Sequence, residues 1–438
     1  MTSTLCRPRR LAWASAAWFA LAALGIVTAT AAAENWPGWR GPTGLGYSQE
    51  KDLPLTWNGK TGENVLWKTL LHGGAKNNPD FTSPGWSSPI VWGDRVFLTT
   101  AIWTDKKLSD KERRKVIAEH HVLCFAVRDG EPLWDTVVPA GKIVVENIYH
   151  GYAVPTPVTD GKHVFALFSS GILAALDFDG KIVWREELPH LRDVDNGICS
   201  SPIVYEDTVI VPGIQDMGLR ALEKATGKLR WEQKTKQRNT MATPAVIRVD
   251  GKLQLIHYAG GIQGLDPATG DQIWTCRAPS SQSSPVYGAG LLYADAGRGG
   301  QKGAAIDPTG KGDVSKTHVK WESRVEGVAG SSAIIVGDHA YRSSGDPRYL
   351  RCWSMATGEL AGEIKAPGLS PSSSPIATPD GRIYFASSRK SYVIRADSKL
   401  EVLATNEIGD GDDYTTPAFS NGRIIIKGKS YLWCIGKK

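Results

Sequence analysis

Residues 200–231, SSPIVYEDTVIVPGIQDMGLRALEKATGKLRW, contain the pattern from which the fold can be predicted. A Ser-Ser-Pro tripeptide opens a β-branched run, further apolar runs follow, and Ala225-Thr226-Gly227 leads to Trp231. Proline is tolerated at the start of a strand, and Thr-Gly supplies the positive φ of a tight hairpin. The stretch therefore predicts an antiparallel unit of four strands whose outer strand carries a large apolar side chain.

The tripeptide recurs along the chain, each time at the head of an apolar run. Its eight copies are Ser87-Ser88-Pro89, Pro155-Thr156-Pro157, Ser200-Ser201-Pro202, Ala242-Thr243-Pro244, Ser283-Ser284-Pro285, Ser331-Ser332-Ala333, Ser373-Ser374-Pro375 and Thr415-Thr416-Pro417. Successive copies lie 68, 45, 42, 41, 48, 42 and 42 residues apart. Strands that repeat every ~40 to 45 residues are typical of propeller blades. We predict an all-β, eight-bladed β-propeller of four-stranded blades over residues 64–438, with insertions in the two long intervals.

The eighth unit ends after its third strand, at the C-terminus. Residues 64–70, NVLWKTL, resemble the outer strand KIVWREEL at residues 181–188. We predict that residues 64–70 pair with the C-terminal strands and close the ring, which removes the exposed sheet edges.

Outer-strand tryptophans are predicted to cover the hairpin turn of the next blade, where they bury a large apolar area. They are Trp67, Trp134, Trp184, Trp231, Trp274 and Trp321. Units six and seven carry Leu360-Ala361-Gly362 and Leu403-Ala404 there, so weaker docking is expected between those blades. One helix is predicted in the first insertion, where Ser109 and Glu112 form a capping box.

Length and composition agree with a single repeat domain. The 438 residues would otherwise suggest about three domains of ~150 residues each. With 41% hydrophobic and 22% charged residues, the chain is neither disordered nor collagen-like. The net charge of +6 falls to +3 when Arg7, Arg9 and Arg10 are removed with a leader, leaving 48 basic and 45 acidic side chains. That balance gives no electrostatic argument for binding nucleic acid or a membrane surface.

Residues 1–33 have the features of a secretory signal peptide. A basic start precedes an apolar stretch from Leu11 to Val27, and Ala31-Ala32-Ala33 precedes Glu34. We predict cleavage after Ala33, an N-terminal arm at residues 34–63, and a secreted or periplasmic protein without stable membrane insertion. The alternative is an uncleaved membrane anchor, since residues 11–33 are long enough to span a bilayer.

Five cysteines follow the leader, at positions 124, 199, 276, 352 and 434. Their number is odd, their spacing is wide and they lie in apolar runs. We predict buried thiols rather than disulfides.

In a propeller, the loops that enter the innermost strands and the loops between the second and third strands share one face. Their residues surround the mouth of the central funnel. The predicted ligand- or partner-binding residues there are Trp86, Asn147, His150, Asp193, Asp195, Arg238, Asn239, Gln282, Arg298, Arg348, Arg389, Asp410, Asp412, Asp413 and Tyr414, with Lys302 and Lys427 on the same loops. Acidic and basic groups alternate around one opening, which favours a small ligand or a peptide.

No catalytic residue and no metal ligand are predicted. His150 has no identified acidic partner, so a structural hydrogen bond is favoured over general-base catalysis. The acidic run at residues 410–413 does not match the twelve-residue calcium loop, and a solvated turn is favoured. The basic loops lack the interleaved aromatic residues that single-stranded nucleic acid requires.

The Ser-Ser-Pro strand and the Ala-x-Asp-x-x-Thr-Gly-x-x-x-Trp turn resemble the pyrroloquinoline quinone-like (PQQ-like) β-propeller family over residues 64–438. The segment NWPGWRGP at residues 35–42 resembles the N-terminal segment of secreted bacterial members. One branch, the quinoprotein dehydrogenases, oxidises alcohols or sugars with PQQ and Ca²⁺. Another, with the BamB-type outer-membrane assembly proteins, is non-enzymatic and binds partner proteins. The chain lacks the adjacent cysteine pair of many alcohol dehydrogenases and the lipid-attachment cysteine of assembly lipoproteins.

Fold alone does not fix function. We expect a monomeric, non-catalytic binding scaffold for a protein, peptide or other cell-envelope partner, without a cofactor. The alternative is a quinoprotein oxidoreductase that holds PQQ and Ca²⁺ in its funnel.

Overall fold

The computed structural model describes residues 1, 34–72, 85–105, 107–113, 115–142, 145, 151–189, 197–212, 217–235, 241–279, 282–295, 301–325, 330–345, 348–370, 372–411 and 415–438. The predicted signal peptide therefore lies outside the described residues, apart from Met1. Residues 33–438 form one compact unit. Within the described part, no helix is long and apolar enough to cross a membrane.

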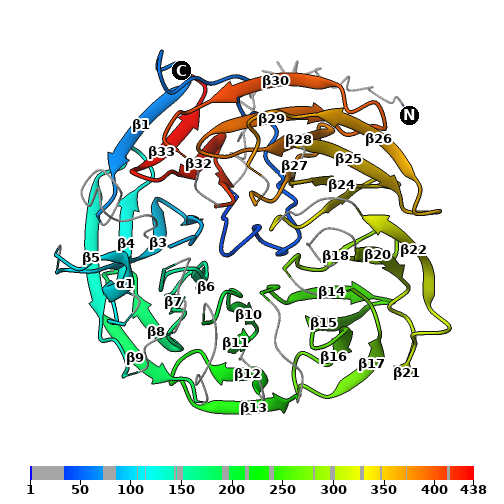
Figure 1. The fold of residues 1–438 in the computed structure, drawn as a ribbon, viewed down its shortest axis with the longest axis horizontal. Helices are drawn as coiled ribbons and strands as arrows, with labels where there is room; N and C mark the ends of the chain where they lie inside the picture. The colour runs from blue at the N-terminus through cyan, green and yellow to red at the C-terminus, as the bar shows by residue number, and fades with distance from the viewer. Residues whose placement is uncertain are drawn as a thin grey trace. The chain divides into compact units, whose positions relative to one another are not determined.

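Eight separate sheets follow one another around a ring, as predicted (Figure 1). Blade 1 contains β2 (Ile90–Trp92), β3 (Arg95–Ile102), β4 (Glu119–Ala126) and β5 (Pro132–Val138). Blade 2 contains β6 (Val158–Thr159), β7 (His163–Leu167), β8 (Ile172–Asp177) and β9 (Ile182–Glu187). Blade 3 contains β10 (Ile203–Tyr205), β11 (Thr208–Pro212), β12 (Met217–Glu223) and β13 (Leu229–Lys234). Blade 4 contains β14 (Ala245–Val249), β15 (Lys252–Tyr258), β16 (Ile262–Leu265) and β17 (Gln272–Cys276).

The second half of the ring repeats the same order. Blade 5 contains β18 (Val286–Gly288), β19 (Leu291–Asp295), β20 (Gln301–Ile306) and β22 (Val319–Val325). Blade 6 contains β23 (Ile334–Val336), β24 (His339–Ser343), β25 (Tyr349–Ser354) and β26 (Leu360–Lys365). Blade 7 contains β27 (Ile376–Ala377), β28 (Arg382–Phe385), β29 (Lys390–Arg395) and β30 (Val402–Glu407). Blade 8 contains β31 (Ala418–Ser420), β32 (Arg423–Lys427), β33 (Tyr431–Gly436) and β1 (Val65–Leu70).

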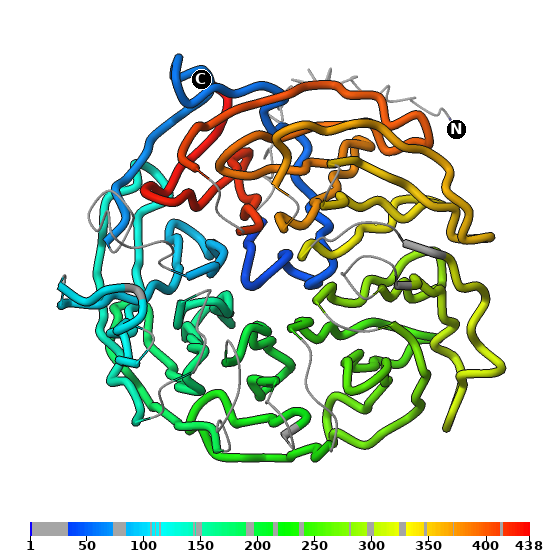
Figure 2. Tube along the Cα trace, in the orientation of Figure 1, coloured from blue at the N-terminus to red at the C-terminus, as the bar shows by residue number. Residues whose placement is uncertain are grey.

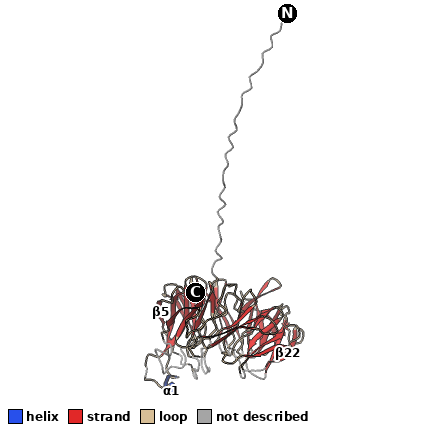
Figure 3. Ribbon diagram, turned by 90° about the horizontal axis from the view of Figure 1, so that it is seen from above, coloured by secondary structure: helices blue, strands red, loops and turns tan. Residues whose placement is uncertain are grey.

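Strands dominate the fold, and the short helix α1 (Asp110–Arg113) lies at its edge (Figure 3). The predicted capping box is present, because Ser109 N–H donates to Glu112 Oε2 at 2.8 Å and Glu112 N–H donates to Ser109 Oγ at 3.4 Å. The Ser109 hydroxyl also donates to Glu112 Oε2 at 2.6 Å, and the side-chain and backbone hydrogen bonds from Ser109 together lower the pKa of Glu112. The short strand β21 (Gly312–Asp313) was not predicted, and it adds a fifth strand to blade 4 by parallel pairing with β17.

The N-terminal strand closes the ring, as predicted. β1 pairs antiparallel with β33, and Lys68 faces Trp433 in the register. The first and last strands of the propeller lie side by side in Figure 1. The outer edge of β33 is therefore paired, which removes a site for edge-to-edge association.

A circle of hydrogen bonds also closes the ring of blades. It is formed by the middle residue of each repeated tripeptide. Each of these eight hydroxyl oxygens accepts the backbone N–H of its counterpart in the preceding blade. The bonds run Ser88 to Thr156 (3.0 Å), Thr156 to Ser201 (3.0 Å), Ser201 to Thr243 (3.0 Å), Thr243 to Ser284 (2.8 Å), Ser284 to Ser332 (2.8 Å), Ser332 to Ser374 (3.0 Å), Ser374 to Thr416 (3.2 Å) and Thr416 to Ser88 (2.9 Å). The last bond returns to the first blade, so the circle is complete.

Most outer-strand tryptophans dock on the next blade, as predicted. Their indole N–H groups donate to turn carbonyls, from Trp67 to Val127 (2.9 Å), Trp134 to Phe178 (2.9 Å), Trp184 to Lys224 (2.7 Å) and Trp321 to Met355 (2.7 Å). Gly130, with φ +75°, shows why the turn needs glycine, since a Cβ there would lie 2.4 Å from the Trp67 ring. Trp231 packs against Gly270 in the same way, although its N–H bonds to no described residue.

Trp274 departs from the predicted contact. It is fully buried, and its N–H donates to Gln254 Oε1 within its own blade at 2.8 Å. The Gln254 amide then donates to Pro308 O at 3.2 Å, in the corresponding turn of blade 5. The side chain of Gln254 thus relays a contact that other blades make directly.

The N-terminal arm supplies a tryptophan where blade 7 has none. Trp57 is 2% exposed and belongs to the apolar cluster that contains Ala404 and Ile408. Its backbone N–H donates to the Asn406 side chain at 2.9 Å, which holds the arm beside β30. Between blades 6 and 7, Gly362 allows close approach, because a Cβ there would lie 2.0 Å from the Ser398 carbonyl.

The first part of the arm enters the ring and contacts inner strands of several blades (Figure 2). Trp36 exchanges backbone hydrogen bonds with Val91 of blade 1, at 2.8 and 2.9 Å. Pro37 accepts a bond from Thr159 of blade 2, and Ser48 donates to Ala377 of blade 7. The arm therefore holds together blades that are far apart in sequence.

All five cysteines are free thiols, as predicted. Cys124, Cys276, Cys352 and Cys434 are buried, whereas Cys199 is half-buried. Burial raises the pKa of the Cys124 thiol to about 12, which suppresses its reactivity as a thiolate.

Candidate functional site

The loops predicted to share one face do contact one another in blades 6 to 8. Arg348, after the second strand of blade 6, accepts a backbone hydrogen bond from Ala366 at 2.9 Å. Asp410, ahead of blade 8, donates its N–H to Ser388 O at 3.2 Å and accepts from Lys429 N–H at 3.2 Å. This face is called the funnel face below.

The funnel-face residues predicted from the sequence divide into two sets. Those outside the described residues are Asn147, His150, Asp193, Asp195, Arg238, Asn239, Arg298, Asp412, Asp413 and Tyr414. Those that the structure places are Trp86, Gln282, Arg348, Arg389 and Asp410. Arg389 is exposed, and the other four are half-buried.

Asp410 and Arg348 hold the loops of their own blades. Asp410 Oδ2 accepts the backbone N–H of Tyr431 at 2.8 Å and the indole N–H of Trp433 at 3.1 Å. Arg348 donates to the backbone carbonyl of Leu369. These contacts give both side chains a structural task that the acidic and basic runs did not reveal.

Two lysines assigned to this face are bound to other groups of the protein. Lys427 is fully buried, and its ammonium group donates at 2.7 Å to the carbonyl of Gly85, in the loop that enters blade 1. Lys302 lies in β20 and donates to Glu322 Oε2 across the sheet at 2.6 Å. The number of free cations around the opening is therefore smaller than the sequence suggests.

A cavity of about 390 Å³ lies between the arm and the inner strands of blades 2 to 4. The described residues that line it are Pro37, Gly38, Trp39, Gly41, Pro42, Thr43, Gly44, Trp92, Val158, Thr159, Pro202, Ile203, Val204, Thr243, Pro244, Ala245 and Val246. None of them has an ionisable side chain. The cavity thus offers apolar surface, threonine hydroxyls and backbone groups.

Arg40, which lies in the arm between Trp39 and Gly41, is a buried cation. Its Nη2 donates to Ala333 O at 2.7 Å, while Nε and Nη1 bond to no described residue. Burial lowers the pKa of Arg40 to about 10. The guanidinium anchors the arm against blade 6 and does not line the cavity.

The cavity does not fit the quinone and Ca²⁺ that the family resemblance allows. Trp39 and Trp92 contribute aromatic rings. Ca²⁺ takes about 6–8 oxygen ligands, usually with carboxylates among them. Among the described lining residues there is no carboxylate and no side-chain amide. We therefore assign no reaction step to such a group in this cavity.

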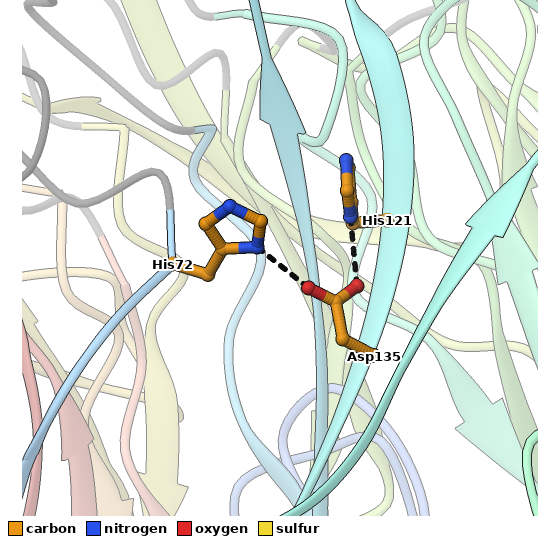
Figure 4. Close-up of side chains that lie close together, drawn as sticks. All are labelled: His72, His121 and Asp135. Carbon is orange, nitrogen blue, oxygen red and sulfur yellow. Dashed lines mark hydrogen bonds and ion pairs between the residues drawn. The ribbon is translucent and has the colours of Figure 1, made fainter. Parts of the chain in front are cut away.

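A separate cluster joins His72, which follows β1, to His121 of β4 and Asp135 of β5 (Figure 4). Asp135 accepts from both imidazoles, with His72 Nδ1 at 2.6 Å and His121 Nδ1 at 2.7 Å. Burial raises the pKa of Asp135, but its hydrogen bonds with the two histidines outweigh burial, so the pKa lies below its usual value. This cluster could not be found from the sequence, because its members are spread over three strand regions.

The comparisons with known proteins agree with the fold. The model of the family described as outer membrane protein assembly factor BamB matches residues 47–189 and 118–363. BamB from Moraxella catarrhalis is 16% identical, with a TM-score of 0.53 over 84% of this chain and 97% of that chain. No curated protein matches the sequence.

Enzymes of the same fold are equally similar. A europium-containing methanol dehydrogenase is 12% identical, with a TM-score of 0.51 over 92% of this chain and 89% of that chain. The quinohemoprotein alcohol dehydrogenase from Comamonas testosteroni is 11% identical, with a TM-score of 0.51 over 92% and 81%. Likeness at this level of identity establishes the fold and does not choose between a scaffold and an enzyme.

Proposed function

Since this chain belongs to the PQQ-like propeller family described as outer membrane protein assembly factor BamB, we propose that it is a non-catalytic binding scaffold. Its partner is a protein or peptide of the cell envelope. The chain works in the periplasm or outside the cell, in line with its predicted signal peptide. The partner binds at the funnel face, where Arg389 is exposed.

The lining of the cavity between the arm and blades 2 to 4 carries the proposal. Ca²⁺ usually has carboxylates among its oxygen ligands, and the described residues that line this cavity supply none. The arm also crosses the ring beside this cavity, with Trp36 and Ser48 bonded to blades 1 and 7. Because the arm occupies part of the centre of the ring, recognition through the loops of the funnel face is favoured.

A photo-crosslinking amino acid at Arg389 tests this function in the cell envelope. Adducts with envelope proteins are expected from this position and are identified by mass spectrometry. The matched control replaces Lys162, an exposed residue in the turn between the first two strands of blade 2, on the opposite face. Equal adducts at both positions, or none at Arg389, would contradict the proposal.

The quinoprotein alternative is tested on the purified protein. Calorimetry with PQQ and Ca²⁺ is combined with reduction of an artificial electron acceptor in the presence of alcohols or sugars. The scaffold proposal predicts neither saturable binding nor turnover. Tight binding accompanied by turnover would replace the scaffold with an oxidoreductase.

A further inference from the structure

The closing strand brings a histidine to the joint between blades 8 and 1. His72 follows β1, and the N–H of Leu71 still donates to Ser430 O at 2.9 Å, so the chain remains paired up to that point. In blade 1, His121 of β4 faces Val137 of β5 in the register. Asp135, two residues earlier on β5, is therefore its diagonal neighbour on the same face of the sheet.

One nitrogen from each imidazole and one oxygen of Asp135 lie within 4.8 Å of one another. The His121 side chain is 5% exposed, and its Nε2 makes no hydrogen bond with any described residue. Glu119 Oε2 lies 3.4 Å from that nitrogen. His72 is 57% exposed, which leaves the cluster open to solvent on one side.

Blade 5 has a lysine–glutamate ion pair at the positions that correspond to His121 and Asp135. Lys302 and Glu322 occupy the same diagonal relation as His121 and Asp135, because Lys302 faces Arg324 and Ala304 faces Glu322. Their side chains form a surface ion pair at 2.6 Å. An ammonium group has no lone pair to offer a metal, whereas a neutral imidazole has one. The pair in blade 1 thus has a ligand chemistry that its counterpart lacks.

We propose that His72, His121 and Asp135 bind a divalent transition-metal cation of the Zn²⁺ type. Imidazole nitrogen suits Zn²⁺, Ni²⁺, Cu²⁺ and Co²⁺, whereas Ca²⁺ and Mg²⁺ prefer oxygen ligands throughout. Three protein ligands leave a fourth position open to water, on the side where His72 is exposed. With His121 Nδ1 on the metal, Glu119 Oε2, 3.4 Å from Nε2, would help to orient the ring.

The ion would connect the closing strand to blade 1. His72 belongs to the segment after β1, and both other ligands lie on β4 and β5. Because the site exists only when the ring is closed, binding favours the closed form and raises the unfolding temperature as metal concentration increases.

Titration calorimetry of tag-free protein, without residues 1–33, tests the site with Zn²⁺ alone. One saturable site is expected, with no heat from Ca²⁺ at the same concentration. The exposed ligand is removed in His72→Ala, which should weaken binding by more than about 100-fold, while Glu119→Gln should weaken it by about 10–100-fold. Lys302→Ala is the matched control and should bind as the wild type does.

Co²⁺ in place of Zn²⁺ gives a spectroscopic readout of coordination. Wild-type protein and Lys302→Ala should show the visible absorption of a four-coordinate ion, and His72→Ala should lose it. His72→Cys should restore binding and add a thiolate-to-metal band. Equal Zn²⁺ affinity of the wild type and His72→Ala, or the absence of saturable Zn²⁺ binding, would overturn the proposal and leave the scaffold function untouched.

Discussion

At the residue scale, one hydroxyl position does the same task in all eight blades. The middle residue of each tripeptide is Ser or Thr because its side chain accepts an N–H from the neighbouring blade. The site is buried, with Ser201 4% exposed and Thr156 2% exposed. A backbone N–H at such a site has no access to water and depends on the hydroxyl oxygen.

Ser201→Ala should lower the free energy of unfolding by about 1–3 kcal/mol, since it leaves the N–H of Thr156 without an acceptor. Ser201→Thr keeps the oxygen and reproduces the residue found at this position in three other blades, so its stability should match the wild type. Urea unfolding followed by tryptophan fluorescence measures both. Equal stability of the alanine and threonine variants would show that the ring of bonds contributes little.

At the element scale, tryptophan docking ties most outer strands to the next hairpin. Trp184 reaches blade 3 directly, whereas Trp274 reaches blade 5 through Gln254. The joint between blades 7 and 8 uses neither arrangement. There, Trp57 enters from the arm beside Ala404, so the arm completes the packing that the repeat leaves open.

Trp57→Ala should therefore destabilise the protein by about 3–5 kcal/mol, which is the usual cost of deleting a buried aromatic side chain. Leu360→Ala, at an outer-strand side chain that is 52% exposed, should change the free energy of unfolding by less than about 0.5 kcal/mol. Denaturant titration of the two variants checks the contrast. Similar small losses for both would mean that the arm is not part of the packed blade.

The repeat made the blades, the closing strand and most tryptophan contacts predictable, because each depends on local spacing. β21 was not predictable, since Gly312–Asp313 has no apolar alternation. Trp57 was missed because the arm lies outside the repeat. His72, His121 and Asp135 come together only through the register of three strands, and the structural task of Asp410 depends on Trp433, 23 residues further along the chain.

At the scale of the whole molecule, three kinds of contact close the same ring. β1 pairs with β33, the hydroxyl bonds return from Thr416 to Ser88, and the arm joins blade 1 to blade 7. These contacts link the two ends of the propeller, so disruption of one exposes the others to solvent. We expect such a ring to unfold as a cooperative unit, whose stability then responds to any buried group that must change its charge.

His257 is such a group. It is fully buried in β15, neither ring nitrogen bonds to a described residue, and burial lowers its pKa to about 3. The folded state keeps the imidazole neutral, while the unfolded chain takes up a proton near its usual pKa of about 6.5. The unfolded state therefore binds more protons between these values, and stability falls as the pH drops from about 6.5 towards 3.

His257→Leu should remove this contribution, which reaches about 1.4 kcal/mol per pH unit for a single group. Its free energy of unfolding should fall less steeply than that of the wild type between pH 6.5 and pH 4. Tyr258→Phe is the control, because burial raises the pKa of this neighbouring hydroxyl well above its usual value and the group does not titrate in this range. Denaturant midpoints at a series of pH values should therefore shift uniformly for Tyr258→Phe and change slope only for His257→Leu. Parallel curves for the wild type and His257→Leu would assign the acid sensitivity to other groups.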